Sequence, residues 1–154
     1  MKQSKRLKRL LLVGIVLFWL VVIFLLSSQP ASHSNDLSQG ITEKVVRAIE
    51  KVTNQQLDLH QWNRWIRKNA HFFLYFILGI FLMFGLTAFR VRLRRASMYA
   101  FGISVLYAIS DEVHQLFVDG RGGQVRDVLI DSAGAALGVV LFAVLYRMLR
   151  FKRD

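Results

Sequence analysis

The acidic residues of this chain are concentrated in one stretch. Five of its ten aspartates and glutamates lie between positions 111 and 131, together with a histidine, a glutamine and two arginines: Asp111, Glu112, His114, Gln115, Asp119, Arg121, Arg126, Asp127 and Asp131. A histidine beside carboxylates is the usual pair for general acid and base chemistry. The candidate catalytic residues are therefore His71, Asp111, Glu112, Asp127 and Asp131, and a structural polar network is the alternative.

A glycine-rich turn, Gly120-Arg121-Gly122-Gly123, lies in the middle of this stretch. The backbone N–H groups of such a turn before a helix can hold an anion such as a phosphate, and arginines complement its charge. The candidate binding residues are His71, Tyr75, Glu112, Gln115, Arg121 and Arg126. In the competing interpretation the turn is structural and the two arginines neutralise nearby acids.

The sequence does not indicate metal chemistry. His71, His114, Asp111 and Glu112 are of the types that ligate metals, but they form no HExxH or comparable pattern. The chain has no cysteine, which excludes a thiolate site, a disulfide framework and a cysteine nucleophile. We predict neither a metal nor a cofactor.

The composition predicts a membrane protein. Hydrophobic residues make up 54% of the 154 residues, which is too apolar for an ordinary soluble domain. The predicted partner of this surface is the lipid bilayer. The net charge is +11, but the basic residues stand in short runs beside apolar segments and not along one polar face, so no nucleic-acid partner is predicted.

The hydrophobic pattern predicts an all-α fold, a four-helix transmembrane bundle with spans over about residues 10–26, 70–89, 96–118 and 128–149. The first span is interpreted as an uncleaved anchor and not a signal peptide, because Ser27-Ser28-Gln29-Pro30 lacks a small-x-small cleavage site. The third apolar run ends at Ile109 and is too short to cross, so its helix is expected to continue to Val118.

Charge asymmetry predicts the orientation. The N-terminal tail, the 90–95 turn and the C-terminal end hold 13 of the 21 lysines and arginines, and the other two connections hold 8. The positive-inside rule then places both termini in the cytoplasm. In the first external loop, Leu37, Ile41, Val45, Ile49 and Val52 recur at helical spacing, which predicts an amphipathic helix over about 37–53. It lies on the membrane or packs against protein.

This topology brings the polar residues to one place. The start of the second span, the end of the third and the start of the fourth meet at the outer leaflet. This brings together nine polar residues: His71, Asp111, Glu112, His114, Gln115, Arg121, Arg126, Asp127 and Asp131. Charges inside hydrocarbon are costly, so several of them imply pairing or a water-filled cavity. Asp127, Asp131, Gly134 and Gly138 share one helix face, and the glycines predict close packing against another helix.

The motifs resemble those of the VanZ-like family of small bacterial membrane proteins. They are Ser27-Ser28-Gln29-Pro30, Arg67-Lys68-Asn69-Ala70-His71 with Tyr75, Asp111-Glu112 with Gln115 and Phe117, Gly120-Arg121, and Asp127 with Gly134 and Gly138. The resemblance implies a single domain over residues 1–154 in the bacterial cytoplasmic membrane, and an influence on susceptibility to the glycopeptide teicoplanin. Two residues depart from the family pattern: Asp119 stands where proline is expected, and Asp131 where asparagine is common.

Two functions follow as hypotheses. In the first, the protein modifies the cell envelope by binding a cell-wall precursor or its lipid-linked anionic head group at an outward-facing polar site. In the second, it is a membrane enzyme that acts on a lipid-linked phosphate or glycan, with His71, Asp111 or Glu112 as acid or base and Arg121 as a phosphate clamp. A transporter is less favoured, because the spans are few and no discontinuous helix is evident.

Overall fold

The protein is all-helical in the part that the computed structural model describes, residues 2–54 and 56–151. Five helices follow one another along the chain: α1 (Lys2–Ser27), α2 (Ala31–Thr53), α3 (Leu59–Ala88), α4 (Leu93–Gln115) and α5 (Val125–Phe151). The predicted all-α class is confirmed, and the amphipathic segment is one of the five helices.

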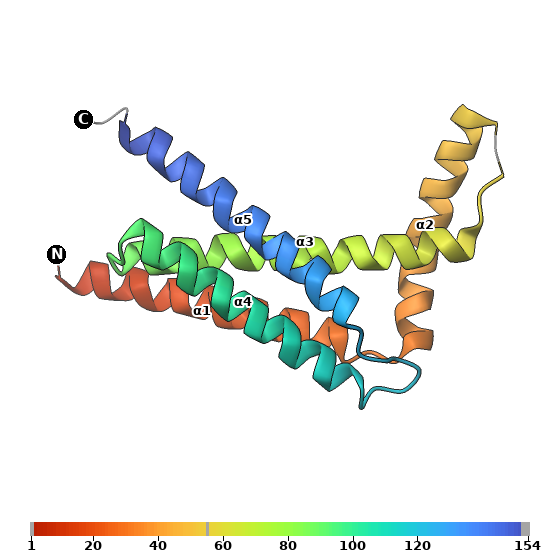
Figure 1. Cartoon of the computed structure of the whole chain (residues 1–154), viewed down its shortest axis with the longest axis horizontal. Coiled ribbons are helices and arrows are strands. Elements are labelled where there is room, and N and C mark those ends of the chain that lie inside the picture. Colours follow the sequence, from red (N-terminus) through yellow and green to blue (C-terminus); the bar gives the residue numbers. More distant parts are fainter. Residues whose placement is uncertain (1, 55, 152–154) are drawn as a thin grey trace.

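The body of the molecule consists of α1, α3, α4 and α5 (Figure 1). These helices run alternately in opposite directions, so both chain ends and the α3–α4 turn lie at the same end of the bundle, called here the terminal end. The α1–α2 and α4–α5 connections lie at the opposite end, called the far end. There α2 crosses the first half of α3 and packs against it.

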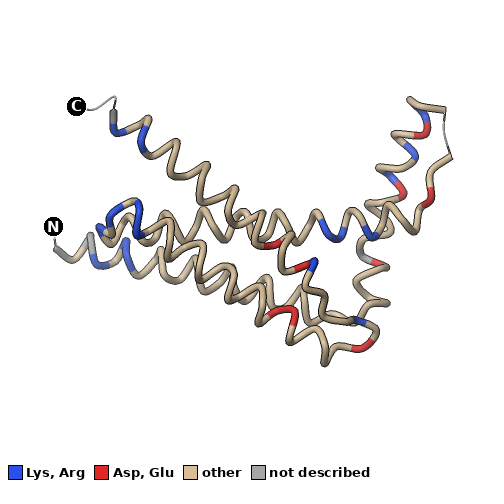
Figure 2. Tube along the Cα trace, in the orientation of Figure 1, with Lys and Arg blue, Asp and Glu red and all other residues tan. Residues whose placement is uncertain are grey.

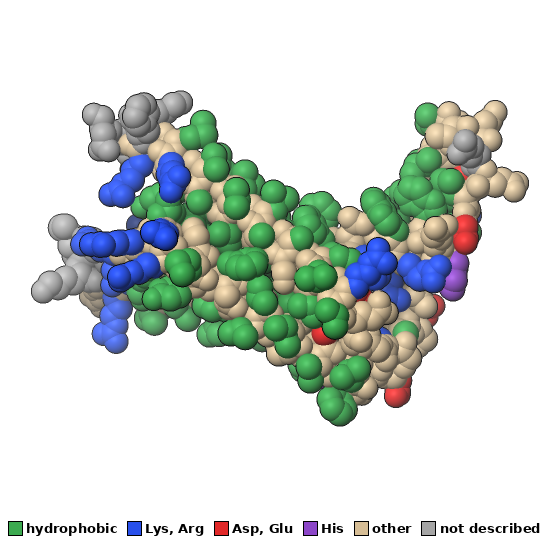
Figure 3. Space-filling view, in the orientation of Figure 1, with side chains coloured by type: hydrophobic (Ala, Val, Ile, Leu, Met, Phe, Trp, Pro, Cys, Tyr) green, Lys and Arg blue, Asp and Glu red, His purple; other side chains and the backbone are tan. Residues whose placement is uncertain are grey.

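Three helices are long and apolar enough to cross a membrane, over Arg6–Ser27, Leu59–Ala88 and Val125–Arg150. Their apolar side chains cover much of the outside of the bundle (Figure 3). Among the described helices, α4 is not one of these three candidate spans by length and hydropathy. It carries Arg94 and Arg95 near its start and Asp111 and Glu112 near its end.

The helix boundaries correct several predictions. The predicted second span began at residue 70, but α3 begins at Leu59, because the Asp58 side chain caps it by accepting from the His60 backbone N–H at 2.9 Å. The predicted third helix reached Val118, but α4 ends at Gln115. The chain then folds back through short turns. Gly120 in these turns has a φ of +71°, a conformation that glycine adopts without strain.

The helix α2 is rotated from the orientation that its apolar stripe suggests. It packs through Thr42 and Val46, which are buried, whereas Ile41, Val45 and Val52 of the predicted apolar face stay exposed. The side chain of Leu37, also assigned to that face, lies outside the described part. Thr42 Oγ1 donates to Asn63 Oδ1 of α3 at 3.1 Å, so polar contacts share this interface. The exposed apolar face is free to contact lipid.

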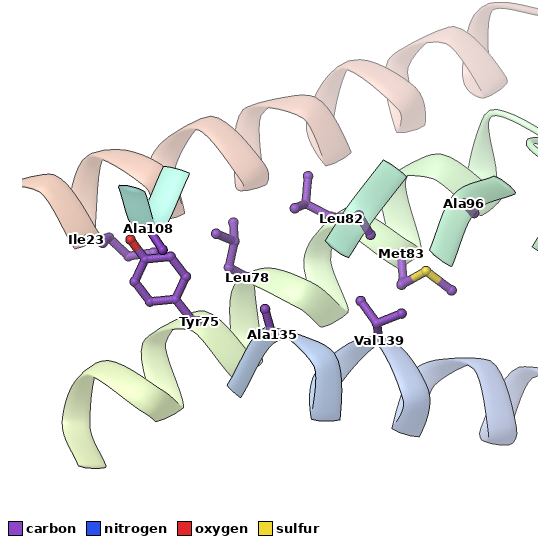
Figure 4. Packing of buried hydrophobic residues seen from close by; sticks show 10 residues of the cluster. Ile23, Tyr75, Leu78, Leu82, Met83, Ala96, Ala108, Ala135 and Val139 are labelled. Carbon is purple, nitrogen blue, oxygen red and sulfur yellow. The ribbon is translucent and has the colours of Figure 1, made fainter. Parts of the chain in front are cut away.

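Glycines bring α3 and α5 into backbone contact. A Cβ atom at Gly134 would overlap the carbonyl oxygen of Phe72, and one at Gly138 would overlap that of Phe76. Around this contact, Tyr75, Leu78, Leu82 and Met83 of α3 pack with Ala135 and Val139 of α5 (Figure 4). The sequence predicted close packing along the Gly134 and Gly138 seam, and the structure confirms it.

A second seam of small residues packs α4 into the bundle. Ala96, Ala100, Ser104 and Ala108 recur every four residues and are completely buried. Because residues four apart lie above one another on a helix, the same face continues toward Asp111 and Gln115, which are also buried, with 3% and 7% of their surfaces exposed. Packing of the small residues therefore directs these polar side chains into the bundle.

We expect substitution of Gly134 by leucine to disrupt the bundle. The new side chain would occupy the space of the Phe72 backbone, and overpacking of this kind costs about 1–3 kcal/mol or more. Thermal unfolding of the purified protein in detergent should show a clearly lower midpoint. Gly102→Leu is the matched control, because a Cβ atom at Gly102 meets nothing within 4 Å. Equal midpoints for the two variants would show that the α3–α5 contact is looser than described.

Candidate functional site

A polar cavity of about 300 Å³ lies at the far end of the bundle. Residues from α2, α3, α4, α5 and the 116–124 connection line it, and many of them are charged or are histidines: His60, Arg64, Arg67, Lys68, His71, Glu112, Arg121, Asp127 and Asp131. This charge pattern contrasts with the terminal end, where Figure 2 shows lysines and arginines in a group. The cavity therefore combines cations and acids in one space.

One helix supplies most of the cations. Arg64, Arg67, Lys68 and His71 stand at positions i, i+3, i+4 and i+7 of α3 and so share one face. Arg67 Nη1 donates to Asn35 Oδ1 of α2 at 2.9 Å. Lys68 forms an ion pair with Asp127 of α5. These contacts hold the cationic face toward the cavity and connect three helices around it.

Arg121 faces this cationic helix from the α4–α5 connection. Its Nη2 donates to the carbonyl oxygen of Leu26 at 3.5 Å, and its Nε atom is buried with no hydrogen-bond partner. Burial first, and then the neighbouring charge of Arg67, lower the pKa of the Arg121 guanidinium from its ordinary value. That ordinary value is so high that the group stays protonated at neutral pH. Two guanidinium groups that act on each other across a cavity favour an anion between them.

Glu112 holds the connection in place. Its Oε2 accepts from the Gln124 backbone N–H at 2.8 Å, just before α5 begins, and its Oε1 accepts from Gln115 Nε2 at 3.3 Å. Gln115 Nε2 also donates to Ser27 Oγ at the end of α1, at 2.9 Å. The connection approaches α4 so closely that a Cβ at Gly123 would lie 2.6 Å from the Glu112 carbonyl oxygen. Glu112 and Gln115 thus join the ends of α1, α4 and α5.

Two further acids lie deeper. Asp131 is completely buried, and its Oδ2 is 3.8 Å from His71 Nδ1, which is too long for a hydrogen bond. Asp111 is buried beside them, and one ligand-type atom from each of His71, Asp111 and Asp131 lies within 4.8 Å of the other two. His71 and Asp131 also line the cavity, so these two residues form part of its floor, whereas Asp111 is not part of the lining.

The structure places the predicted site residues in three groups. His71, Glu112, Gln115, Arg121, Asp127 and Asp131 line the cavity. Asp111 and Tyr75 are buried but are not part of its lining. Arg126 is exposed and does not line the cavity. His114 contacts Ser28 at 3.1 Å and packs against Phe24 with the two rings tilted and their centroids 4.7 Å apart, so it joins α4 to α1.

Sequence reasoning missed the contribution of Arg64, Arg67 and Lys68. Next to Trp62 and Trp65, these basic residues have the composition of an interfacial belt, because tryptophans and basic residues often flank a span, so residue type alone does not assign them to a cavity. The i, i+3, i+4, i+7 spacing that ends at His71 is the signal that would have found them. Asn35 and Asn63 had no such signal, because only the packing of α2 on α3 brings them to the cavity.

Comparison with known proteins places the chain in a family. Neither a curated protein nor a solved structure matches it. A family model described as VanZ/LLP1 matches residues 12–146, a range that includes every residue named in the lining of the cavity. Because this match covers well over half of the sequence, the chain belongs to the VanZ/LLP1 family, as the motifs indicated, and is a multi-pass membrane protein with three candidate spans.

Proposed function

We propose that the protein crosses a bacterial cytoplasmic membrane four times, with both termini in the cytoplasm and the cavity at the outer face. The alternating directions of α1, α3, α4 and α5 support an even number of crossings. The lysines and arginines that Figure 2 shows at the terminal end support the orientation. In this topology α4 is the third of the four spans, and its packing against α3 and α5 keeps Asp111 and Glu112 away from lipid.

The cavity in this topology binds the anionic head group of a lipid-linked cell-wall precursor. The observation that carries this proposal is the group of guanidiniums around one cavity, contributed by Arg64, Arg67 and Arg121. Within the described part of the chain, the carboxylate of Asp127 is paired with Lys68, and no ion pair joins these three arginines to an acid. Arginine is suited to phosphate, because its planar group donates two parallel hydrogen bonds.

The direct test compares a charged lipid with an uncharged one. The purified full chain in detergent is titrated with a short-chain polyprenyl phosphate and with the polyprenol of the same length. We expect the phosphate to bind at least about tenfold more tightly, which corresponds to about 1.4 kcal/mol. Equal affinities would contradict head-group binding, because the two lipids differ only in the phosphate.

An effect on the envelope is the cellular consequence of this proposal. A protein that retains or masks a precursor at the outer leaflet lowers the action of a glycopeptide on it. Expression of the chain in a teicoplanin-sensitive bacterium should raise the minimal inhibitory concentration. Arg121→Ala should remove the increase at equal membrane abundance. If expression of the wild-type chain leaves the inhibitory concentration unchanged, the chain does not affect glycopeptide susceptibility.

The second candidate function is enzymatic and rests on the acids of the same cavity. His71, Glu112 and Asp131 line it together with the arginines, so groups able to transfer protons adjoin the place proposed for a phosphate. If the protein is an enzyme, lipid extracts of overexpressing cells should contain a new product, and this product should be absent when the cells express Glu112→Gln. Extracts identical to those of cells without the chain would exclude this candidate.

A further inference from the structure

We infer that His71, Asp111 and Asp131 bind one divalent metal ion at the floor of the cavity. The three residues come from α3, α4 and α5, and their ligand atoms lie within 4.8 Å of one another. Tetrahedral ligands bonded to an ion such as Zn²⁺ at about 2.0–2.2 Å are roughly 3.3–3.6 Å apart. Side-chain shifts of less than about 1 Å would bring all three to bonding distance.

Unpaired buried atoms provide the second observation. Both carboxylate oxygens of Asp131 and Oδ1 of Asp111 are buried without a hydrogen-bond partner. Asp131 is 0% exposed and Asp111 is 3% exposed. Oδ2 of Asp111 accepts a long hydrogen bond, 3.5 Å, from Gln115 Nε2. Buried carboxylates are normally paired, hydrogen-bonded or bound to a metal. Here the only close charged partner of Asp131 among the described residues is His71, at 3.8 Å, so three carboxylate oxygens have no hydrogen bond and can take a common ligand.

The donor set also suits a cation. Asp111 and Asp131 bring two carboxyl groups into the bundle, and His71 lies close to both. The lysine that reaches α5 pairs with Asp127. A neutral imidazole with two carboxylates is a ligand set for a first-row divalent ion, which neutralises both charges at once.

The site can be reached from the cavity, and its three protein ligands do not fill the coordination shell of a metal ion. His71 and Asp131 line the cavity, whereas Asp111 lies behind them. Three protein ligands leave at least one coordination position open, and the open side faces the cavity with Arg67 and Arg121. An anion in the cavity would therefore contact the metal and the guanidiniums together. Metal binding itself needs no lipid, so the inference is independent of the proposed head-group function.

The experiment uses the full chain in detergent, stripped with a chelator and titrated with Mn²⁺ alone. The electron paramagnetic resonance signal of free Mn²⁺ reports binding, and Zn²⁺ should compete for the same site. We expect one Mn²⁺ per chain for the wild type and at least a tenfold loss of affinity for Asp131→Asn and for Asp111→Asn. The control is Asp119→Asn, which makes the same chemical change at an exposed residue and should bind as the wild type does.

Thermal unfolding supplies a second measurement on the same samples. An ion that binds only the folded chain raises the unfolding midpoint in proportion to its occupancy. Mn²⁺ should raise it for the wild type and Asp119→Asn, and much less for Asp131→Asn, whose side chain keeps the volume of aspartate. If the wild type shows no saturable Mn²⁺ or Zn²⁺ binding, or if Asp131→Asn binds equally well, the inference is wrong. The carboxylates would then share a proton in place of a metal.

Discussion

Substitution of Arg67 by alanine should weaken binding of a polyprenyl phosphate by roughly 10- to 100-fold, and so should substitution of Arg121. A hydrogen bond to a charged group contributes about 1.5–3 kcal/mol, and each 1.4 kcal/mol is a factor of ten in affinity. Arg67 lies on the α3 face of the cavity and Arg121 on the opposite connection, so both are placed to contact one phosphate. The measurement is titration of each purified variant with the same lipid.

Arg126→Ala is the matched control for this prediction. Arg126 belongs to the same charge class and lies five residues from Arg121, but its side chain is exposed and does not line the cavity. The affinity of the Arg126→Ala variant for the lipid phosphate should stay within about a factor of two of the wild-type affinity, which is about 0.4 kcal/mol. A loss as large as that of Arg121→Ala would mean that general surface charge, and not the cavity, attracts the lipid.

Alanine at Glu112 should lower the stability of the protein more than glutamine does. Glu112→Ala removes the side-chain acceptor of the Gln124 N–H and one acceptor of the Gln115 amide, and an unmade hydrogen bond of a buried group costs about 1–3 kcal/mol. Glu112→Gln keeps an acceptor oxygen for the Gln124 N–H and removes the repulsion from Asp111, Asp127 and Asp131, but its NH2 group replaces the oxygen that accepts from Gln115. We expect the alanine variant to unfold at the lowest temperature and the glutamine variant to unfold between the alanine variant and the wild type.

Hydrogen exchange locates this effect. In Glu112→Ala, amides of the 116–124 connection should exchange faster, because the side chain that joins α4 to the start of α5 is gone. The amides of the α3–α5 seam near Gly134 should exchange as in the wild type. If both regions change together, Glu112 stabilises the whole bundle and not the connection alone.

Much of the fold follows from local patterns in the sequence. The apolar runs of α1, α3 and α5 identify spans because about 20 apolar residues are needed to cross a bilayer. Gly134 and Gly138 on the Asp131 face predict close packing, because residues four apart share a helix face. The 111–131 acids could be assigned to one end of the bundle, because short connections force successive helices to reverse direction.

The residues that make up the site were harder to predict from the sequence than the fold. Arg64, Arg67 and Lys68 belong to the cavity only because α3 starts at Leu59 and its first turns extend beyond the body of the bundle (Figure 1). The end of α4 at Gln115 depends on the contact between Glu112 and Gln124, which joins residues of two different elements. The burial of Thr42 in place of the apolar stripe of α2 depends on its partner Asn63.

By itself, then, the sequence determined the helices, their membrane character, the family and the gathering of acids at one end, because these depend on hydrophobicity, periodicity and motifs within single segments. Only the tertiary structure decided which cations face those acids, that Arg126 stays outside the cavity, and that His71, Asp111 and Asp131 converge. The physical reason is that such contacts depend on the rotation and crossing angle of each helix, which are set by packing between segments far apart in the chain.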